Sequence, residues 1–270
     1  IAYEGGTILI DCGEGAFQQL RRAGFDLKQV RELFITHHHF DHIGSLFACL
    51  GLNMMMHRHQ PMNIYGPPGT SKILDHLIAA CDIPQATGFS VPGQTLPHPR
   101  DFINSRDIQP GEILYIDDIR ISCCENTHYR PEDQFGKQGP ISLSYRFDAP
   151  DRSMVFTGDT GPCLALEEFA KNADLLVGEL FDTELVINRL RATNPDMSDH
   201  ALLQMRQHFD EHHLTPEDLG QLASRAGVKK VVAVHIPFIT KSAEEDAKYV
   251  SRILAKFSGS VTISEDLAAY

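Results

Sequence analysis

The sequence predicts an α/β fold of two mixed sheets flanked by helices, in a single domain over residues 1–270. Three observations predict it. Strand-like and helix-like segments alternate in the first part of the chain, strand-like segments alone run from Gly111 to Asp159, and the alternation then returns. Strands in both halves, each with helices beside them, suit a sandwich of two sheets with the helices outside.

The first part of the chain predicts three strands and three helices. Apolar runs predict strands, and apolar residues at helical spacing predict helices, at Thr7–Asp11, Ala16–Arg22, Val30–Ile35, Ile43–Met56, Asn63–Tyr65 and Ser71–Cys81. The segment Pro84–Asp107 is rich in Pro, Gly and polar residues, which predicts a surface excursion. The opening residues Ile1–Tyr3 read like the middle of a fold, so we expect its first strands to be missing here.

The rest of the chain predicts six strands and two helices. Turn-forming residues separate the strands Ile113–Tyr115, Ile119–Cys124, Ile141–Phe147, Met154–Thr157, Leu175–Glu179 and Val231–Val234. Helices are expected at Pro216–Ala226 and Ala243–Phe257. Thr215 is the expected N-cap of the first of these helices, because a hydroxyl residue followed by Pro is typical of a helix start.

Composition excludes some classes of function. The formal net charge is −12 and the basic residues are scattered, which argues against binding phosphate backbones by charge alone. No run of about 18 apolar residues occurs, so we expect no membrane span. The six cysteines form no CxxC pair, which favours buried thiols in a reducing compartment and a cytoplasmic location.

The strongest chemical signal is a cluster of imidazoles directly after the predicted strand Val30–Ile35. It reads Thr36-His37-His38-His39-Phe40-Asp41-His42. Such a set of nitrogen and oxygen donors is what zinc and similar divalent ions require. The alternative is a purification tag or an exposed His-rich loop, but a tag would not lie between a core strand and an amphipathic helix.

The pattern His37-x-His39-x-Asp41-His42 resembles the signature of the metallo-β-lactamase superfamily, whose fold is a four-layer αββα sandwich. The resemblance implies further ligands at the ends of later strands, and His128, Asp159 and His235 occupy such places. A lone His after a strand is more often a capping or core residue, so the complete set carries the argument. The resemblance implies one metal held by His37, His39 and His128, a second held by Asp41, His42 and His235, and Asp159 bridging them.

Two divalent ions at one site imply hydrolysis. They lower the pKa of a shared water enough to supply a bridging hydroxide near neutral pH and polarise the substrate oxygen. Asp41 is placed to orient that water or accept its proton. We expect two zinc ions, with manganese or iron as alternatives, and no covalent intermediate.

Other segments resemble the tRNA 3′-processing endonuclease (RNase Z) branch of that superfamily. They are Asp11-Cys12-Gly13-Glu14-Gly15, Gln18-Gln19-Leu20, Tyr65-Gly66-Pro67-Pro68-Gly69, Ser142-Leu143-Ser144-Tyr145-Arg146, Ala173–Glu179 and His213-Leu214-Thr215. The resemblance implies that Glu179 orients His213 and that His213 protonates the leaving oxygen. The alternative for His213 is an ordinary histidine near a helix start.

One departure from that branch bears on the substrate. The long exosite arm of some RNase Z enzymes lies between the third His motif and the bridging Asp, and the interval from His128 to Asp159 is too short for it. We therefore expect a phosphodiester substrate, either a small molecule or an RNA. The alternatives are a lactone, β-lactam, ester or arylsulfatase-like hydrolase on the same core and, from another class, a non-catalytic binding module.

Candidate substrate contacts are fewer. Tyr129 begins the loop Tyr129-Arg130-Pro131 after His128, so it is expected to cover the metals and meet substrate. Arg146 could meet an anionic group or form a structural salt bridge. The resemblance also implies a homodimer.

Overall fold

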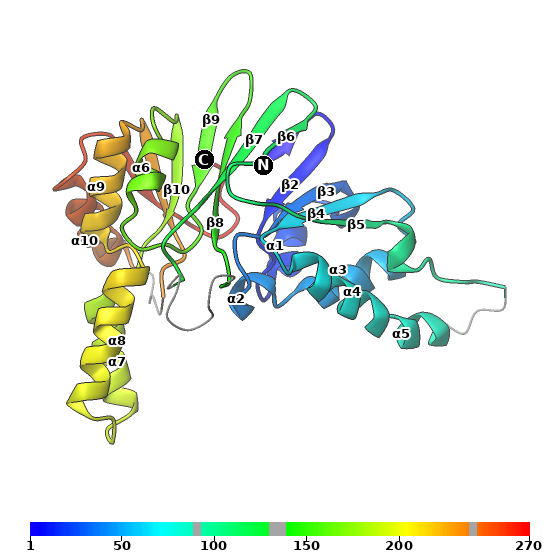
Figure 1. The fold of residues 1–270 in the computed structure, drawn as a ribbon, viewed down its shortest axis with the longest axis horizontal. Coiled ribbons are helices and arrows are strands. Elements are labelled where there is room, and N and C mark those ends of the chain that lie inside the picture. The colour runs from blue at the N-terminus through cyan, green and yellow to red at the C-terminus, as the bar shows by residue number, and fades with distance from the viewer. Residues whose placement is uncertain (89–92, 130–138, 238–241) are drawn as a thin grey trace. The chain divides into compact units, whose positions relative to one another are not determined.

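The computed structural model describes residues 1–88, 93–129, 139–237 and 242–270. Within them the chain forms two compact units, Ile1–Gln109 and Pro110–Ala268. Each unit has its own mixed sheet, flanking helices and apolar core (Figure 1). The predicted fold class is therefore confirmed, whereas the single domain stays a prediction. Among the helices of the described part, none is long and apolar enough to cross a membrane.

The first unit contains a five-stranded sheet with the order β1-β2-β3-β4-β5. Only β1 is antiparallel to its neighbour. The strands are β1 (Ala2–Tyr3), β2 (Gly6–Ile10), β3 (Val30–Phe34), β4 (Met62–Gly66) and β5 (Ile103–Asp107). The helices are α1 (Ala16–Arg22), α2 (Phe40–Ile43), α3 (Leu46–Met55), α4 (Thr70–Ala80) and α5 (Asp82–Thr87), with 3-10 turns η1 (Leu27–Gln29) and η2 (Pro99–Asp101).

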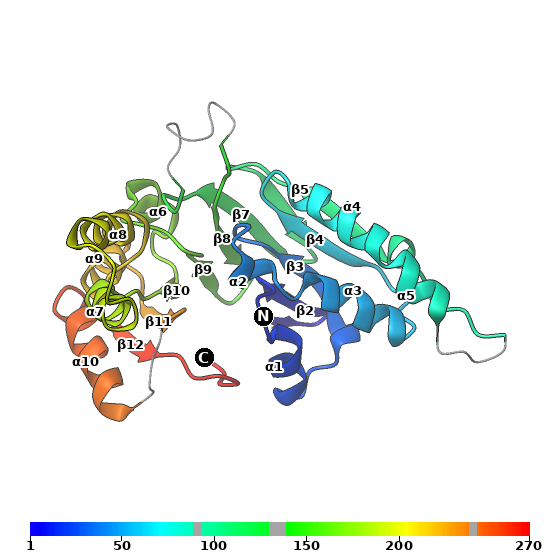
Figure 2. The same ribbon diagram turned by 90° about the horizontal axis from the view of Figure 1, so that it is seen from below.

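The core of the first unit forms where α3 and α4 lie along the sheet (Figure 2). Leu33 on β3 and Ile64 on β4 are fully buried together with Leu50 of α3 and Leu74 of α4. Burying side chains of this size stabilises the fold by about 1.5–3 kcal/mol each. The packed sheet and helices hold residues 36–42, called the histidine loop below, which follow β3 and include the start of α2.

Two expectations for this unit need correction. The prediction of a surface excursion over Pro84–Asp107 is wrong at its C-terminal end, because β5 lies there and pairs in parallel with β4. Its sequence Ile-Asn-Ser-Arg-Asp hides the strand pattern, since at the sheet edge only Ile103 is buried. The single helix Ile43–Met56 is in fact α2 followed by α3, separated at Gly44-Ser45.

The second unit contains a seven-stranded sheet with the order β12-β11-β10-β9-β8-β7-β6. Neighbours from β6 to β9 are antiparallel, and those from β9 to β12 are parallel. The strands are β6 (Ile113–Ile116), β7 (Ile119–Glu125), β8 (Leu143–Asp148), β9 (Ser153–Phe156), β10 (Leu175–Glu179), β11 (Lys230–Val234) and β12 (Ser260–Ile263). The helices are α6 (Leu164–Phe169), α7 (Thr183–Thr193), α8 (Asp199–His212), α9 (Pro216–Ala226) and α10 (Ala243–Leu254).

Helix α9 shows why the second core was predictable. The Thr215 hydroxyl accepts a hydrogen bond from the Asp218 N–H, as expected of an N-cap. Gly227 ends the helix in the left-handed conformation at φ 65°. Between them Leu219 and Ala223 are fully buried against the parallel strands.

Helices α7 and α8 form a hairpin that was not predicted. They pack side by side and extend away from the sheet of their unit (Figure 1). Both begin at side-chain caps, Asp182 and Ser198, and an ion pair joins Glu184 to Arg206. The sequence pattern does not predict the hairpin, because most of its residues are polar and exposed and its buried stripe is narrow.

Candidate metal centre

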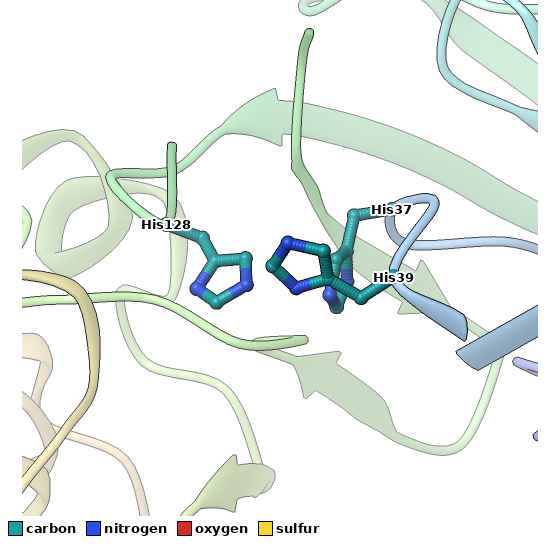
Figure 3. Close-up of side chains that lie close together, drawn as sticks. All are labelled: His37, His39 and His128. Carbon is teal, nitrogen blue, oxygen red and sulfur yellow. The ribbon is translucent and has the colours of Figure 1, made fainter. Parts of the chain in front are cut away.

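The first group of donors lies on the histidine loop, which covers the residues directly after β3 and the first residues of α2. The ring centroid of His37 is 4.8 Å from that of His39 and 4.0 Å from that of His42. Figure 3 shows His37 and His39 rising from this loop and His128 from the loop after β7. Imidazoles this close would repel one another if protonated, so they suit the neutral form, which is the form that ligates metals.

Asp11 fixes the orientation of this loop. Its carboxylate accepts hydrogen bonds from the Thr36 N–H at 2.7 Å and the Thr36 hydroxyl at 2.8 Å. A third contact joins the same carboxylate to Nδ1 of His42 at 2.7 Å. Nε2 of that ring is therefore left as the donor atom for a metal. Asp11 adopts a left-handed φ of 61°, a strained conformation for a residue with a side chain.

Gly13 and His38 hold the loop from two other directions. A Cβ at Gly13 would lie 1.9 Å from the carbonyl oxygen of Asp41, so only glycine allows the backbones to approach this closely. Nε2 of His38 lies 2.7 Å from the Thr70 hydroxyl at the start of α4. The middle histidine of the cluster thus anchors the loop to a helix.

The second group of donors lies at one edge of the seven-stranded sheet. Asp159, Glu179 and His235 follow or end the neighbouring parallel strands β9, β10 and β11. Carboxyl ends of parallel strands meet at the same edge, and one donor atom from each of these residues lies within 4.8 Å of the others. His128, Asp159 and His213 form an overlapping group by the same measure.

His213 contacts a buried carboxylate. Its Nδ1 lies 2.8 Å from Oε2 of Glu179, while the Thr160 N–H donates to Oε1. Phe181 stacks on the imidazole with ring centroids 4.3 Å apart. Burial raises the pKa of Glu179, and the neighbouring Asp159 carboxylate raises it further. Two buried carboxylates this close require a compensating positive charge, which divalent ions at the donor groups would supply.

The orientation of His128 depends on a residue from α8. Nδ1 of His128 lies 3.1 Å from the carbonyl oxygen of His212, and Nδ1 of His212 lies 2.8 Å from that of Thr127. These reciprocal contacts leave Nε2 of His128 as the donor atom on the side of Asp159, whose Oδ2 is 4.0 Å away. The sequence did not single out His212, because its partners lie far from it in the chain.

The two candidate substrate contacts differ. Tyr129 packs beside His128 with ring centroids 5.2 Å apart, and the remainder of its loop, Arg130 and Pro131, lies outside the described residues. Arg146 donates to Asp148 at 2.7 Å and to the carbonyl oxygens of Phe169 and Lys171 at the end of α6. These contacts match the second of its two expected roles, a structural salt bridge.

The donor set fits zinc or a similar divalent ion. It consists of imidazole nitrogens and carboxylate oxygens, which suit zinc and other first-row metals. Cysteine does not enter these groups among the described residues, and burial raises the pKa of Cys12 near the histidine loop. The chain therefore carries groups that could bind a metal on nitrogen and oxygen alone.

Comparison with known proteins defines the class. Residues 6–236 match the profile described as a beta-lactamase superfamily domain, and the chain belongs to that superfamily. This confirms the metal-dependent hydrolase predicted from the sequence at the level of the superfamily.

One relative and two solved structures illustrate what this chain is similar to. A ribonuclease Z of Mycolicibacterium gilvum is 26% identical over 97% of this chain and 85% of its own length. Among solved structures, the metallo-beta-lactamase fold protein YhfI of Bacillus subtilis has a TM-score of 0.65 at 18% identity, covering 97% and 85% of the two chains. The short form of human tRNase Z has a TM-score of 0.64 at 17% identity, covering 99% and 89%. Both structures share the fold.

Proposed function

We propose that this protein is a dinuclear metal-dependent phosphodiesterase of the ribonuclease Z type. The observation that carries the proposal is the pair of His213 and Glu179 beside Asp159. An imidazole held by a buried carboxylate is a proton donor, and a proton donor next to a metal ligand suits departure of a poor leaving group such as an alkoxide. The relatives named ribonuclease Z support the same chemistry.

The metal ligands are proposed from the donor groups and the superfamily pattern. His37, His39 and His128 would hold one ion, Asp41, His42 and His235 the other, and Asp159 both. When bound, two divalent ions supply Lewis acidity and a hydroxide near neutral pH, and zinc is the proposed metal, with manganese or iron as alternatives.

The chain's own residues then divide the proton transfers. The Asp41 side chain is 64% exposed, so its carboxylate can orient the attacking water and accept its proton. In the second proton transfer, His213 would give a proton to the leaving oxygen. Glu179 would hold the Nδ1–H of His213 and stabilise its charged form.

The substrate is proposed to be a phosphodiester, in an RNA or a small molecule. Tyr129 is kept as a proposed contact because of its place beside His128. The segment in which an exosite arm would lie includes residues 130–138, outside the described part, so its shortness rests on the sequence alone. The homodimer and the cytoplasmic location remain predictions.

The test is cleavage of a precursor tRNA carrying a 3′ trailer by the zinc- or manganese-loaded protein. We expect metal-dependent cleavage next to the discriminator base, lost in a His37→Ala variant. His59→Ala is the matched control, because it removes an exposed imidazole outside the donor groups. Absence of cleavage with metal content confirmed would reject the RNA substrate, and panels of small phosphodiesters, esters and lactams would then be assayed.

A further inference from the structure

Phe40 is an exposed aromatic residue in the middle of the histidine loop. Its side chain is 79% exposed, more than any other large apolar residue among those that the structure describes. It follows His39 and precedes Asp41, so its Cα lies about 3.8 Å from the Cα of each. Exposing a phenyl ring forgoes the free energy of burying it, which calls for a reason at this position.

The ring of Phe40 rests on Gly44. A Cβ at Gly44 would lie 3.2 Å from ring atom Cε1 and 3.4 Å from Cδ1. The absence of a side chain at Gly44 therefore leaves room for the ring against the first turn of α2. Among the described residues no other aromatic ring contacts Phe40, so a planar group could approach the ring.

The net charge of the chain bears on how it can bind a nucleic acid. A net charge of −12 with scattered basic residues provides little attraction for a phosphate backbone. Stacking of bases on aromatic side chains is the other main source of affinity for single-stranded nucleic acid, and it tolerates any base. Phe40 is the exposed aromatic nearest in sequence to the proposed metal ligands His39 and Asp41.

We propose that Phe40 is a stacking platform for a nucleobase adjacent to the scissile phosphodiester. A phosphate bound through His39 and Asp41 would bring its nucleoside to the part of the chain where Phe40, the residue between them in the sequence, is exposed. This inference rests on the proposed function for its substrate class. It also makes a claim about binding that does not require turnover.

The binding test uses the absence of tryptophan from the chain. A Phe40→Trp variant would contain one indole at the proposed platform, and Phe47→Trp would place one on α3 at a phenyl position that is 44% exposed. Both are loaded with zinc and titrated with adenosine 5′-monophosphate or ribose 5-phosphate. We expect saturable quenching of the Phe40→Trp emission by the nucleotide, little quenching by the sugar phosphate, and none specific to the base in Phe47→Trp.

The kinetic test compares two substrates with the same leaving group. Thymidine 5′-(p-nitrophenyl phosphate) and methyl p-nitrophenyl phosphate differ only in the group that the phosphate retains. The quantity compared is kcat/KM for the thymidine ester divided by kcat/KM for the methyl ester. Phe40→Ala should lower this ratio by about tenfold, because the base loses its stacking partner. Phe40→Tyr should restore the ratio, and Phe47→Ala should leave it unchanged.

Several results would overturn the inference. They are an unchanged ratio in Phe40→Ala, equal quenching by the two phosphates, or Phe40→Trp emission that depends on protein concentration, which would indicate contact with a second copy. If the unaltered protein cleaves no phosphodiester, the proposed function fails separately. The fluorescence titration then still decides whether Phe40 receives a base.

Discussion

Among single residues, His213 is fixed by partners of two kinds. Glu179 binds its Nδ1, and Phe181 covers one face of the ring. Both partners come from the end of β10 and the residues directly after it, so one segment orients the imidazole. The carboxylate favours the protonated ring, while the stacked phenyl limits its rotation.

This arrangement predicts a dependence on the leaving group. His213→Ala should lower kcat/KM on the order of 100- to 10,000-fold for a substrate that leaves as an alkoxide. The loss should be far smaller for a p-nitrophenyl ester, because p-nitrophenoxide departs without a proton. Glu179→Gln should follow the same trend with a smaller loss. Equal losses on both substrates would show that His213 does not act as the general acid.

Candidate metal ligands could be named from the sequence, whereas the residues that support them could not. The histidine cluster is local, and its spacing alone brings several donors together. By contrast, Asp11, His212 and Phe181 acquire their roles from contacts across many residues of the chain. Asp11 did stand in a motif that resembles the ribonuclease Z branch, but the motif did not reveal its contact with His42.

Two glycines give opposite predictions for the elements around the histidine loop. Gly13→Ala should destabilise the fold by about 1–3 kcal/mol, because the new Cβ would collide with the Asp41 carbonyl. The displaced loop should also lower the metal content. Gly51→Ala in α3 should instead stabilise by about 1 kcal/mol, since no atom lies within 4 Å of its Cβ position. Urea unfolding measures both, and a neutral Gly13→Ala would contradict the close approach.

The elements found from the sequence are those whose burial is one-sided or complete. The strand β10 and the helices α1 and α9 match their expected bounds, and in α9 the apolar periodicity coincides with the Thr215 cap. The edge strand β5 and the hairpin α7–α8 were missed. Most of their residues are polar and exposed, so tertiary contacts rather than sequence pattern stabilise them.

For the molecule as a whole, metal binding should raise the free energy of unfolding. Zinc at 100 times its Kd should stabilise the folded chain by about 2.7 kcal/mol. His37→Ala in the first unit and His235→Ala in the second should each reduce the resulting rise in Tm. Differential scanning calorimetry with and without a chelator measures it. A full rise in either variant would contradict the proposed role of the substituted histidine as a metal ligand.

The fold class was predictable because it depends on the order of elements and not on their bounds. Alternating segments, then strands alone, then alternation again are enough to indicate two mixed sheets with helices beside them. The division at Gln109–Pro110 was not predictable in the same way. It reflects the density of contacts within each unit, and no linker-like composition marks it.

The hairpin α7–α8 has a consequence for how this protein can change. It begins and ends at residues of the centre, because Glu179 precedes it and His213 follows it. Phe181 closes its base by contacting Phe209 with a tilted ring and by stacking on His213, with ring centroids 4.9 Å and 4.3 Å apart. Sequence beyond that closure can lengthen, shorten or be exchanged while the strands keep their register. This position is thus a natural site for grafting a new recognition module onto an unchanged catalytic core.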